Sequence, residues 1–220
     1  GLIGAGLAAN AALSGFQVCI YDILFDQESE RENCQNRVRS CLQSLVDKSV
    51  VDQCVMETSL SHIVFTPSVQ EAVENACFIQ EAGPERYEVK WSILEQVEQY
   101  AGSDVPIAST TSGLLITEIQ KKARHPERII GGHPYNPAYL IPLIEVTKGE
   151  QSSDAAAQAA MEFYRGIGKE PVLLQKETIG FIANRLQMAV YREAVDLVMR
   201  GVCTVEDVDK SLVYGPGLRW

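Results

Sequence analysis

The sequence has no excess of positive charge. Its 220 residues include 19 lysines and arginines against 29 aspartates and glutamates, which gives a formal net charge of −10. No basic run interrupts this balance. A nucleic-acid-binding surface needs one, because much of its affinity comes from neutralising phosphates. We therefore expect a small-molecule substrate and no nucleic-acid partner.

Long apolar runs are also missing. No segment approaches the roughly 20 apolar residues of a membrane-spanning helix, and no signal peptide opens the chain. The six cysteines are scattered without a CxxC pair, which indicates reduced thiols rather than a disulfide framework or a zinc site. We expect neither a membrane partner nor a metal, and a cytoplasmic location.

Both ends of the chain look cut. It begins on Gly1 within a glycine-rich motif, with no methionine and no strand before it, and it stops at Trp220 just after a Gly-Pro-Gly turn. The hydrophobic fraction of 46% is enough for a real core. We interpret the chain as an internal piece of a longer protein.

The first 22 residues follow the order of a dinucleotide-binding half-motif. A glycine-rich turn precedes a helix of small residues, Gly15 ends that helix, and an apolar strand over 16–21 leads to Asp22. In such motifs the backbone approaches the pyrophosphate at a helix N-terminus, where free N–H groups point outward. Asp22 would accept hydrogen bonds from the adenosine ribose and repel a 2′-phosphate, which favours NAD over NADP.

Two registers of the glycine motif are possible. A complete GxGxxA begins at Gly4, but it leaves three residues for the strand before it. We prefer a second register, in which the motif begins upstream of Gly1 and the helix covers 2–13, about three turns. The predicted cofactor-binding residues of this segment are Gly1, Leu2, Ile3, Gly4 and Asp22.

Helices and short apolar strands alternate along most of the remaining chain. The expected strands cover 62–66, 77–82, 106–109, 143–146 and 171–175, and the expected helices cover parts of 26–58, then 68–76, a long segment from 84, 116–123 and 154–167. This alternation predicts an α/β fold, a Rossmann-type NAD-binding domain over 1–177 that lacks its first strand. A long helix over 180–199 and a helix capped by Thr204 would begin an all-α domain over 178–220.

Polar residues follow two of the expected strands. Glu85 and Lys90 come after one strand, and the hydroxyl-rich turn that contains Ser112 comes after the next. The carboxyl edge of parallel strands is where such sheets bind ligands. Ser112 could place its hydroxyl on a substrate, or its turn could simply cap the following helix.

His133 and Glu145 are the strongest candidates for chemistry. His133 lies in the segment His-Pro-Tyr-Asn-Pro, whose prolines exclude a helix and predict a rigid loop. Glu145 lies inside the apolar strand over 143–146, and a buried acid needs a partner. Taken alone, a histidine beside a proline is more often structural. A carboxylate on one ring nitrogen, however, would fix the tautomer and make the other nitrogen a general base.

Together these segments resemble the L-3-hydroxyacyl-CoA dehydrogenase superfamily along essentially the whole chain. The resemblance rests on the glycine turn with Asp22, on 84–90, 108–112 and 133–137 with Glu145, and on 180–185. It implies that His133 is the catalytic base, that Glu145 orients it, and that Ser112 and Asn184 bond the reacting oxygen. It also implies that Glu85 and Lys90 belong to the NAD site, and that the full-length protein is a homodimer.

The residues after His133 distinguish two branches of that superfamily. Enzymes acting on acyl-CoA typically carry two aromatics there, whereas His-Pro-Tyr-Asn-Pro-Ala-Tyr-Leu-Ile-Pro-Leu resembles the lambda-crystallin (L-gulonate 3-dehydrogenase) and carnitine dehydrogenase branch. The segment 217–220 agrees with this branch. Its Arg219 could bind a free carboxylate bidentately, or it could be a surface cation at a turn.

We therefore predict NAD-dependent oxidation of the 3-hydroxyl of an L-3-hydroxy acid, or of its CoA thioester, to the 3-keto compound. His133 must be neutral to take the proton, so oxidation should become faster as pH rises. One alternative is a strict 3-hydroxyacyl-CoA or 3-hydroxybutyryl-CoA dehydrogenase of fatty-acid metabolism. The other is a non-catalytic, crystallin-like structural protein that binds NAD.

Overall fold

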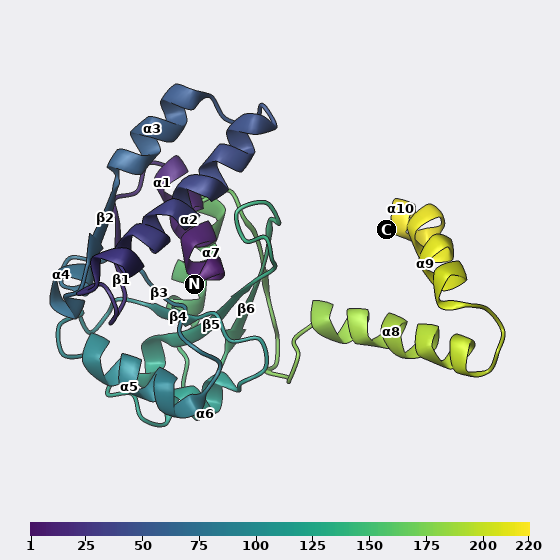
Figure 1. Ribbon diagram of the computed structural model, residues 1–220. Helices are drawn as coiled ribbons and strands as arrows, with labels where there is room; N and C mark the ends of the chain where they lie inside the picture. Colours follow the sequence, from purple (N-terminus) through teal and green to yellow (C-terminus); the bar gives the residue numbers. More distant parts are fainter. The chain divides into compact units, whose positions relative to one another are not determined.

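The computed structural model describes residues 1–220 and divides them into two compact units, Gly1–Ile179 and Gly180–Trp220 (Figure 1). The first unit is an α/β domain and the second is helical. The division lies two residues beyond the expected boundary at 177. No helix combines the length and the hydrophobicity that a membrane crossing requires.

The first unit alternates strands and helices as the sequence predicts. The strands are β1 (Val18–Tyr21), β2 (Ile63–Thr66), β3 (Ile79–Glu81), β4 (Ile107–Ser109), β5 (Ile129–Pro134), β6 (Leu143–Lys148) and β7 (Glu170–Leu173). The helices are α1 (Leu2–Leu13), α2 (Glu28–Asp47), α3 (Gln53–Ser61), α4 (Val69–Val73), α5 (Tyr87–Val97), α6 (Ile116–Gln120) and α7 (Asp154–Gly166), with the short 3-10 turn η1 (Pro126–Arg128).

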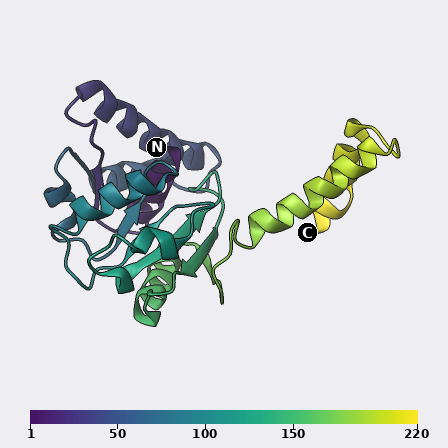
Figure 2. The ribbon, with the colours of Figure 1, turned by 90° about the horizontal axis from the view of Figure 1, so that it is seen from below.

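The strands form two sheets. β1 pairs with β2 in parallel, and a second sheet has the order β3-β4-β5-β6-β7. Every pair in the second sheet is parallel except β5 and β6, which run antiparallel. Helices lie on both faces of the strands (Figures 1 and 2). The parallel strands β3, β4 and β5 therefore end at one common edge, which is where ligands bind in such sheets.

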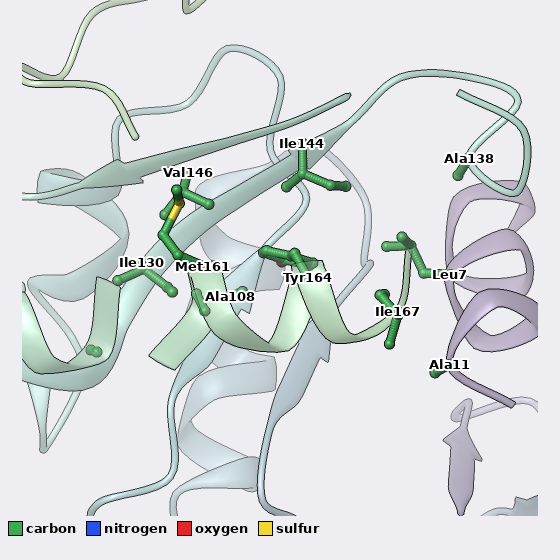
Figure 3. Close-up of a cluster of buried hydrophobic side chains, with 12 residues drawn as sticks. Leu7, Ala11, Ala108, Ile130, Ala138, Ile144, Val146, Met161, Tyr164 and Ile167 are labelled. Carbon is green, nitrogen blue, oxygen red and sulfur yellow. The ribbon is translucent and has the colours of Figure 1, made fainter. Parts of the chain in front are cut away.

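Side-chain alternation along β4 and β5 divides the second sheet into two buried faces. Ile107 and Ile129 pack with residues of α4, α5 and α6 on one face. Ala108 and Ile130 point to the other face, into a cluster with residues of α1, β6 and α7 (Figure 3). Adjacent residues of a strand point to opposite faces of the sheet. Because helices cover both faces, consecutive residues of each strand are apolar, instead of alternating between apolar and polar.

The start of α1 decides between the two glycine registers. The helix begins at Leu2 with Gly1 as its N-cap, and it ends before Gly15, which has φ +85°. The GxGxxA at Gly4 is therefore wrong as a turn motif, because its glycines lie inside the helix. Gly6 has a packing role instead, since a Cβ there would lie 3.1 Å from Ala138 Cβ.

Several element boundaries differ from the sequence prediction. The segment 26–58 contains two helices with a break between them, and α4 and α6 each end three residues early. The long helix expected from residue 84 begins at Tyr87, because Arg86 is extended with φ −144° and ψ 130°. The cap of α4 is confirmed: Ser68 Oγ accepts a hydrogen bond from the Glu71 N–H at 3.3 Å.

The second unit consists of α8 (Ala183–Met199), α9 (Val205–Tyr214) and α10 (Pro216–Arg219). The predicted cap at Thr204 is confirmed as part of a capping box, in which Thr204 and Asp207 each accept from the other's backbone N–H. The helix expected from residue 180 begins at Ala183, and the turn expected at 215–217 leads into α10. No residue of these helices is buried.

Candidate active site at the carboxyl edge of the strands

His133 and Glu145 are paired, as the sequence analysis expected. The antiparallel register of β5 and β6 places the two residues directly opposite each other, so their side chains lie on the same face. His133 Nδ1 and Glu145 Oε2 are 3.0 Å apart, and the two residues are 5% and 1% exposed. A carboxylate oxygen only accepts, so Nδ1 donates this hydrogen bond, and in the neutral imidazole the lone pair is then on Nε2.

The prediction that His133 lies in a loop is wrong. His133 and Pro134 are the last two residues of β5, and the loop begins at Tyr135. Pro134 is tolerated because the pairing of β4 with β5 ends at Gly131, so no hydrogen bond to β4 is lost at the proline. A strand holds the imidazole more firmly than a loop would.

Tyr135 packs against the imidazole. Its ring centroid lies 5.2 Å from that of His133, in an edge-on arrangement with an interplanar angle of 68°. Burial, together with the charge of Glu145, raises the pKa of Tyr135 to about 12. The phenol is therefore protonated at any working pH. The sequence analysis gave Tyr135 no role, although its position two residues after the histidine was a usable signal.

Glu85 holds the turn that contains Ser112. Its Oε1 accepts hydrogen bonds from Thr111 Oγ1 at 2.7 Å, from the Ser112 N–H at 2.8 Å and from the Gly113 N–H at 2.9 Å. Burial acts to raise the pKa of Glu85, but these hydrogen bonds and the nearby Lys90 outweigh it and lower the pKa. Ser112 itself is exposed at the same edge. Glu85 thus positions the serine as well as being a cofactor candidate.

Lys90 lies beneath Glu85 and is fully buried. Its Nζ donates to Glu81 Oε2 at 2.8 Å and lies 3.9 Å from Glu85 Oε2. Glu81 also accepts from Ser109 Oγ at 2.5 Å. With no exposed surface, Lys90 acts on the site through these two carboxylates, and its own contact with a cofactor stays a prediction. The sequence analysis missed Glu81, although an acid at the end of an apolar strand is the signal that pointed to Glu145.

The ionised form of Glu85 should contribute to stability only above its lowered pKa. Because folding lowers this pKa, the contribution is present above the ordinary glutamate range and is lost as pH falls through the folded-state value. We expect the unfolding free energies of wild type and Glu85→Gln to differ at neutral pH and to converge in acid, as measured by urea titration. Glu88→Gln, an exposed change on α5, should show no such convergence. A constant difference at all pH values would contradict the assignment.

The N-terminus of α1 lies at this same edge. A Cβ on Gly4 would lie 3.4 Å from Ala82, which follows β3. The first turn leaves the N–H groups of Leu2 and Ile3 without partners inside the helix, and Leu2 is 71% exposed. Asp22 follows β1 and accepts from the Leu24 N–H at 3.0 Å. These free N–H groups and this carboxylate fit the pyrophosphate and the ribose of a dinucleotide.

Asn184 and Arg219 belong to the second unit. Asn184 lies in the first turn of α8, and Arg219 is exposed at the end of α10. Within the first unit the structure brings together His133 and Glu145, and separately Glu85 and the Ser112 turn. The roles of Asn184 and Arg219 stay predictions.

Two family descriptions match the chain. The NAD-binding domain of 3-hydroxyacyl-CoA dehydrogenase matches residues 1–178, and the C-terminal domain of the same family matches residues 180–220. The fold and these two matches therefore define an NAD-dependent oxidoreductase with a Rossmann-like domain and a helical domain after it. The chain belongs to the 3-hydroxyacyl-CoA dehydrogenase family.

Curated relatives include several L-carnitine dehydrogenases. The chain is 40% identical to the one from Pseudomonas syringae pv. syringae over 220 residues, which is 100% of this chain and 67% of that protein. It is 39% identical to the one from Pseudomonas aeruginosa, of which it covers 66%. The chain thus spans about two thirds of the length of these relatives.

Several solved structures have the same fold as this chain. M. tuberculosis FadB2 has a TM-score of 0.91 and 28% identity, over 99% of this chain and 75% of that one. (S)-3-hydroxybutyryl-CoA dehydrogenase PaaH1 from Ralstonia eutropha has a TM-score of 0.88 and 28% identity, over 96% of this chain and 73% of that one. The fold and the NAD-binding domain are therefore confirmed, and the substrate is a separate question.

Proposed function

We propose that the protein oxidises the 3-hydroxyl of an L-3-hydroxy acid to a 3-keto acid, with His133 as the general base. The observation that carries the proposal is the buried hydrogen bond from His133 to Glu145 at the carboxyl edge of the sheet. A histidine held in one tautomer by a buried carboxylate has a basic second nitrogen. That nitrogen suits proton abstraction from an alcohol.

The proposed reaction consists of one proton transfer and one hydride transfer. His133 Nε2 takes the hydroxyl proton of the substrate, and the new positive charge on the imidazole is stabilised by Glu145. When bound, NAD accepts the hydride from C3. The C3–H and O–H bonds break, the C=O bond forms, and the imidazolium later releases its proton to water. Only the neutral imidazole can start the oxidation, so the rate should rise with pH.

The developing carbonyl oxygen needs hydrogen-bond donors. Ser112 is exposed in the turn after β4, and its backbone N–H is held by Glu85, which supports a role in bonding that oxygen. Asn184 is the second proposed donor. At the cofactor, Leu2 and Ile3 would offer their N–H groups to the pyrophosphate, and Asp22 would bind the adenosine ribose.

We favour a free acid over a CoA thioester as substrate. The support is the similarity to L-carnitine dehydrogenases along 100% of the chain, at 36% to 40% identity. A free carboxylate also suits Arg219 as a bidentate partner. The second candidate is a CoA thioester, which the likeness to a 3-hydroxybutyryl-CoA dehydrogenase supports. We also expect a homodimer, since α8 exposes apolar side chains such as Leu186 and Tyr191.

The substrate proposal is tested by following NADH formation with matched alcohols. L-carnitine, L-gulonate and 3-hydroxybutyrate are compared with 3-hydroxybutyryl-CoA at equal concentrations. We expect turnover of a free acid at a kcat/KM at least tenfold above that of the thioester, because a bidentate arginine–carboxylate pair adds more than 1.4 kcal/mol. Turnover of the thioester alone would move the protein to acyl-CoA metabolism. NAD binding without any turnover would support the non-catalytic, crystallin-like alternative.

A further inference from the structure

The β5–β6 loop, Tyr135–Pro142, connects the two strands that carry His133 and Glu145. It packs on the cofactor helix: Ala138 is buried in a cluster with Leu7 and Ala11 of α1 (Figure 3). On the same helix, Asn10 Nδ2 donates to the Tyr139 carbonyl at 3.3 Å. The loop therefore contacts both the proposed base and the helix of the proposed cofactor site. A residue that holds the loop in place also holds these two parts of the site relative to each other.

Lys169 binds this loop through two carbonyl groups. It lies between α7 and β7, is 4% exposed, and its Nζ donates to the Ala138 carbonyl and to the Ile141 carbonyl, the latter at 3.0 Å. No backbone N–H donates to the Ala138 or the Ile141 carbonyl. The N–H groups of Leu140 and Ile141 within the loop both donate to the Pro137 carbonyl instead. The lysine thus provides the donor for the buried Ala138 carbonyl and for the Ile141 carbonyl, which no backbone N–H reaches.

Stability alone does not account for an ammonium at this position. Lys169 has no carboxylate partner, and burial lowers its pKa to about 8. A buried cation without a counter-ion is costly, and an apolar side chain of the same volume commonly stabilises a core more. What an apolar side chain lacks is the pair of donors that joins Ala138 and Ile141 to the start of β7.

We propose that Lys169 is a positioning residue that fixes the β5–β6 loop and thereby holds α1 and the His133–Glu145 pair in one arrangement. This inference rests on the proposed function for its catalytic consequence. The loop contact itself does not depend on that function. Neither His133 nor Glu145 touches Lys169, so its effect on the reaction is indirect.

The test compares Lys169→Met, Lys169→Arg and the exposed control Lys176→Met. Hydrogen–deuterium exchange of the peptide that covers 135–142 reports the loop without any substrate. We expect faster exchange of this peptide in Lys169→Met and wild-type exchange in Lys176→Met. With the substrate that wild type turns over, kcat should fall about tenfold to a hundredfold in Lys169→Met, because small displacements of catalytic groups have such effects. The Kd of NAD should change less than kcat.

Lys169→Arg and the loop exchange give two further readouts. Lys169→Arg retains two donors and should recover most of the lost kcat. Unchanged loop exchange in a folded Lys169→Met protein would overturn the inference, and so would faster exchange with unchanged kcat. If Lys169→Met does not fold, the test rests on Lys169→Arg. A folded Lys169→Arg protein with wild-type loop exchange and wild-type kcat supports the inference, and a folded one whose 135–142 peptide exchanges faster overturns it. If wild type turns over none of the alcohols, the proposed function fails, while the exchange result still tests the loop contact.

Discussion

Replacing His133 by glutamine is expected to lower kcat about a thousandfold while leaving the Kd of NAD within a few-fold of wild type. Glutamine keeps a polar side chain of similar size but offers no basic nitrogen, and a positioned general base contributes roughly 10²–10⁴-fold to a rate. NAD binding should survive because α1 and Asp22 lie on other elements than His133. Steady-state NADH formation and equilibrium NAD titration measure the two quantities.

The matched control for this variant is His125→Gln. The His125 side chain is partly exposed and pairs with Glu127 at 3.3 Å, away from His133, so its replacement should leave kcat unchanged. A His133→Gln protein that is folded and keeps more than about a tenth of wild-type kcat would show that another group takes the proton. Equal losses in both variants would show that the effect is not specific to His133.

Replacing Gly132 by alanine is expected to destabilise the domain by about 3 kcal/mol or more, because the new methyl group has no space. A Cβ at this position would lie 1.9 Å from Tyr164 Oη, 2.8 Å from Tyr164 Cζ and 3.1 Å from Ala108 Cβ. Tyr164 cannot move freely, since it is fully buried and donates to Gln80 Oε1 at 2.6 Å. Urea unfolding of wild type and variant measures the difference.

Gly166→Ala is the matched control for this change. Gly166 ends α7, and the nearest atom to a Cβ there is 4.0 Å away, so alanine should be neutral or slightly stabilising. Adding Tyr164→Phe to Gly132→Ala removes the 1.9 Å contact and should recover part of the lost stability. A Gly132→Ala protein as stable as wild type would contradict the close packing of Tyr164 and Ala108 against Gly132, the residue before His133.

The His133–Glu145 pair was predictable because its signal is local. An acid inside an apolar strand requires a partner, and a histidine ten residues before that strand is within reach once the two segments form adjacent strands. That His133 lies in a strand was not predictable from its prolines. Pro134 is allowed there because the pairing of β4 with β5 ends at Gly131, two residues before His133, and the lengths of neighbouring strands are a property of the whole sheet.

Glu81 and Lys169 show where sequence reasoning stops. The role of each residue depends on partners that are distant in the chain: Ser109 for Glu81, and Ala138 and Ile141 for Lys169. Glu85 gives the opposite lesson. The sequence analysis predicted that Glu85 begins a helix after a parallel strand, and its role at the cofactor stays a prediction. Its carboxylate instead holds the Ser112 turn, and α5 begins two residues later.

The most direct test of the proposed reaction is hydride transfer from C3. L-carnitine carrying deuterium at C3 is incubated with the protein and NAD, and the reduced cofactor is analysed by mass spectrometry. The proposal predicts NADH that is heavier by one deuterium, together with a 3-keto product that has lost it. Reduced cofactor without deuterium would show that the hydride comes from another carbon. No reduced cofactor from this or any other 3-hydroxy acid or thioester would contradict the proposed function.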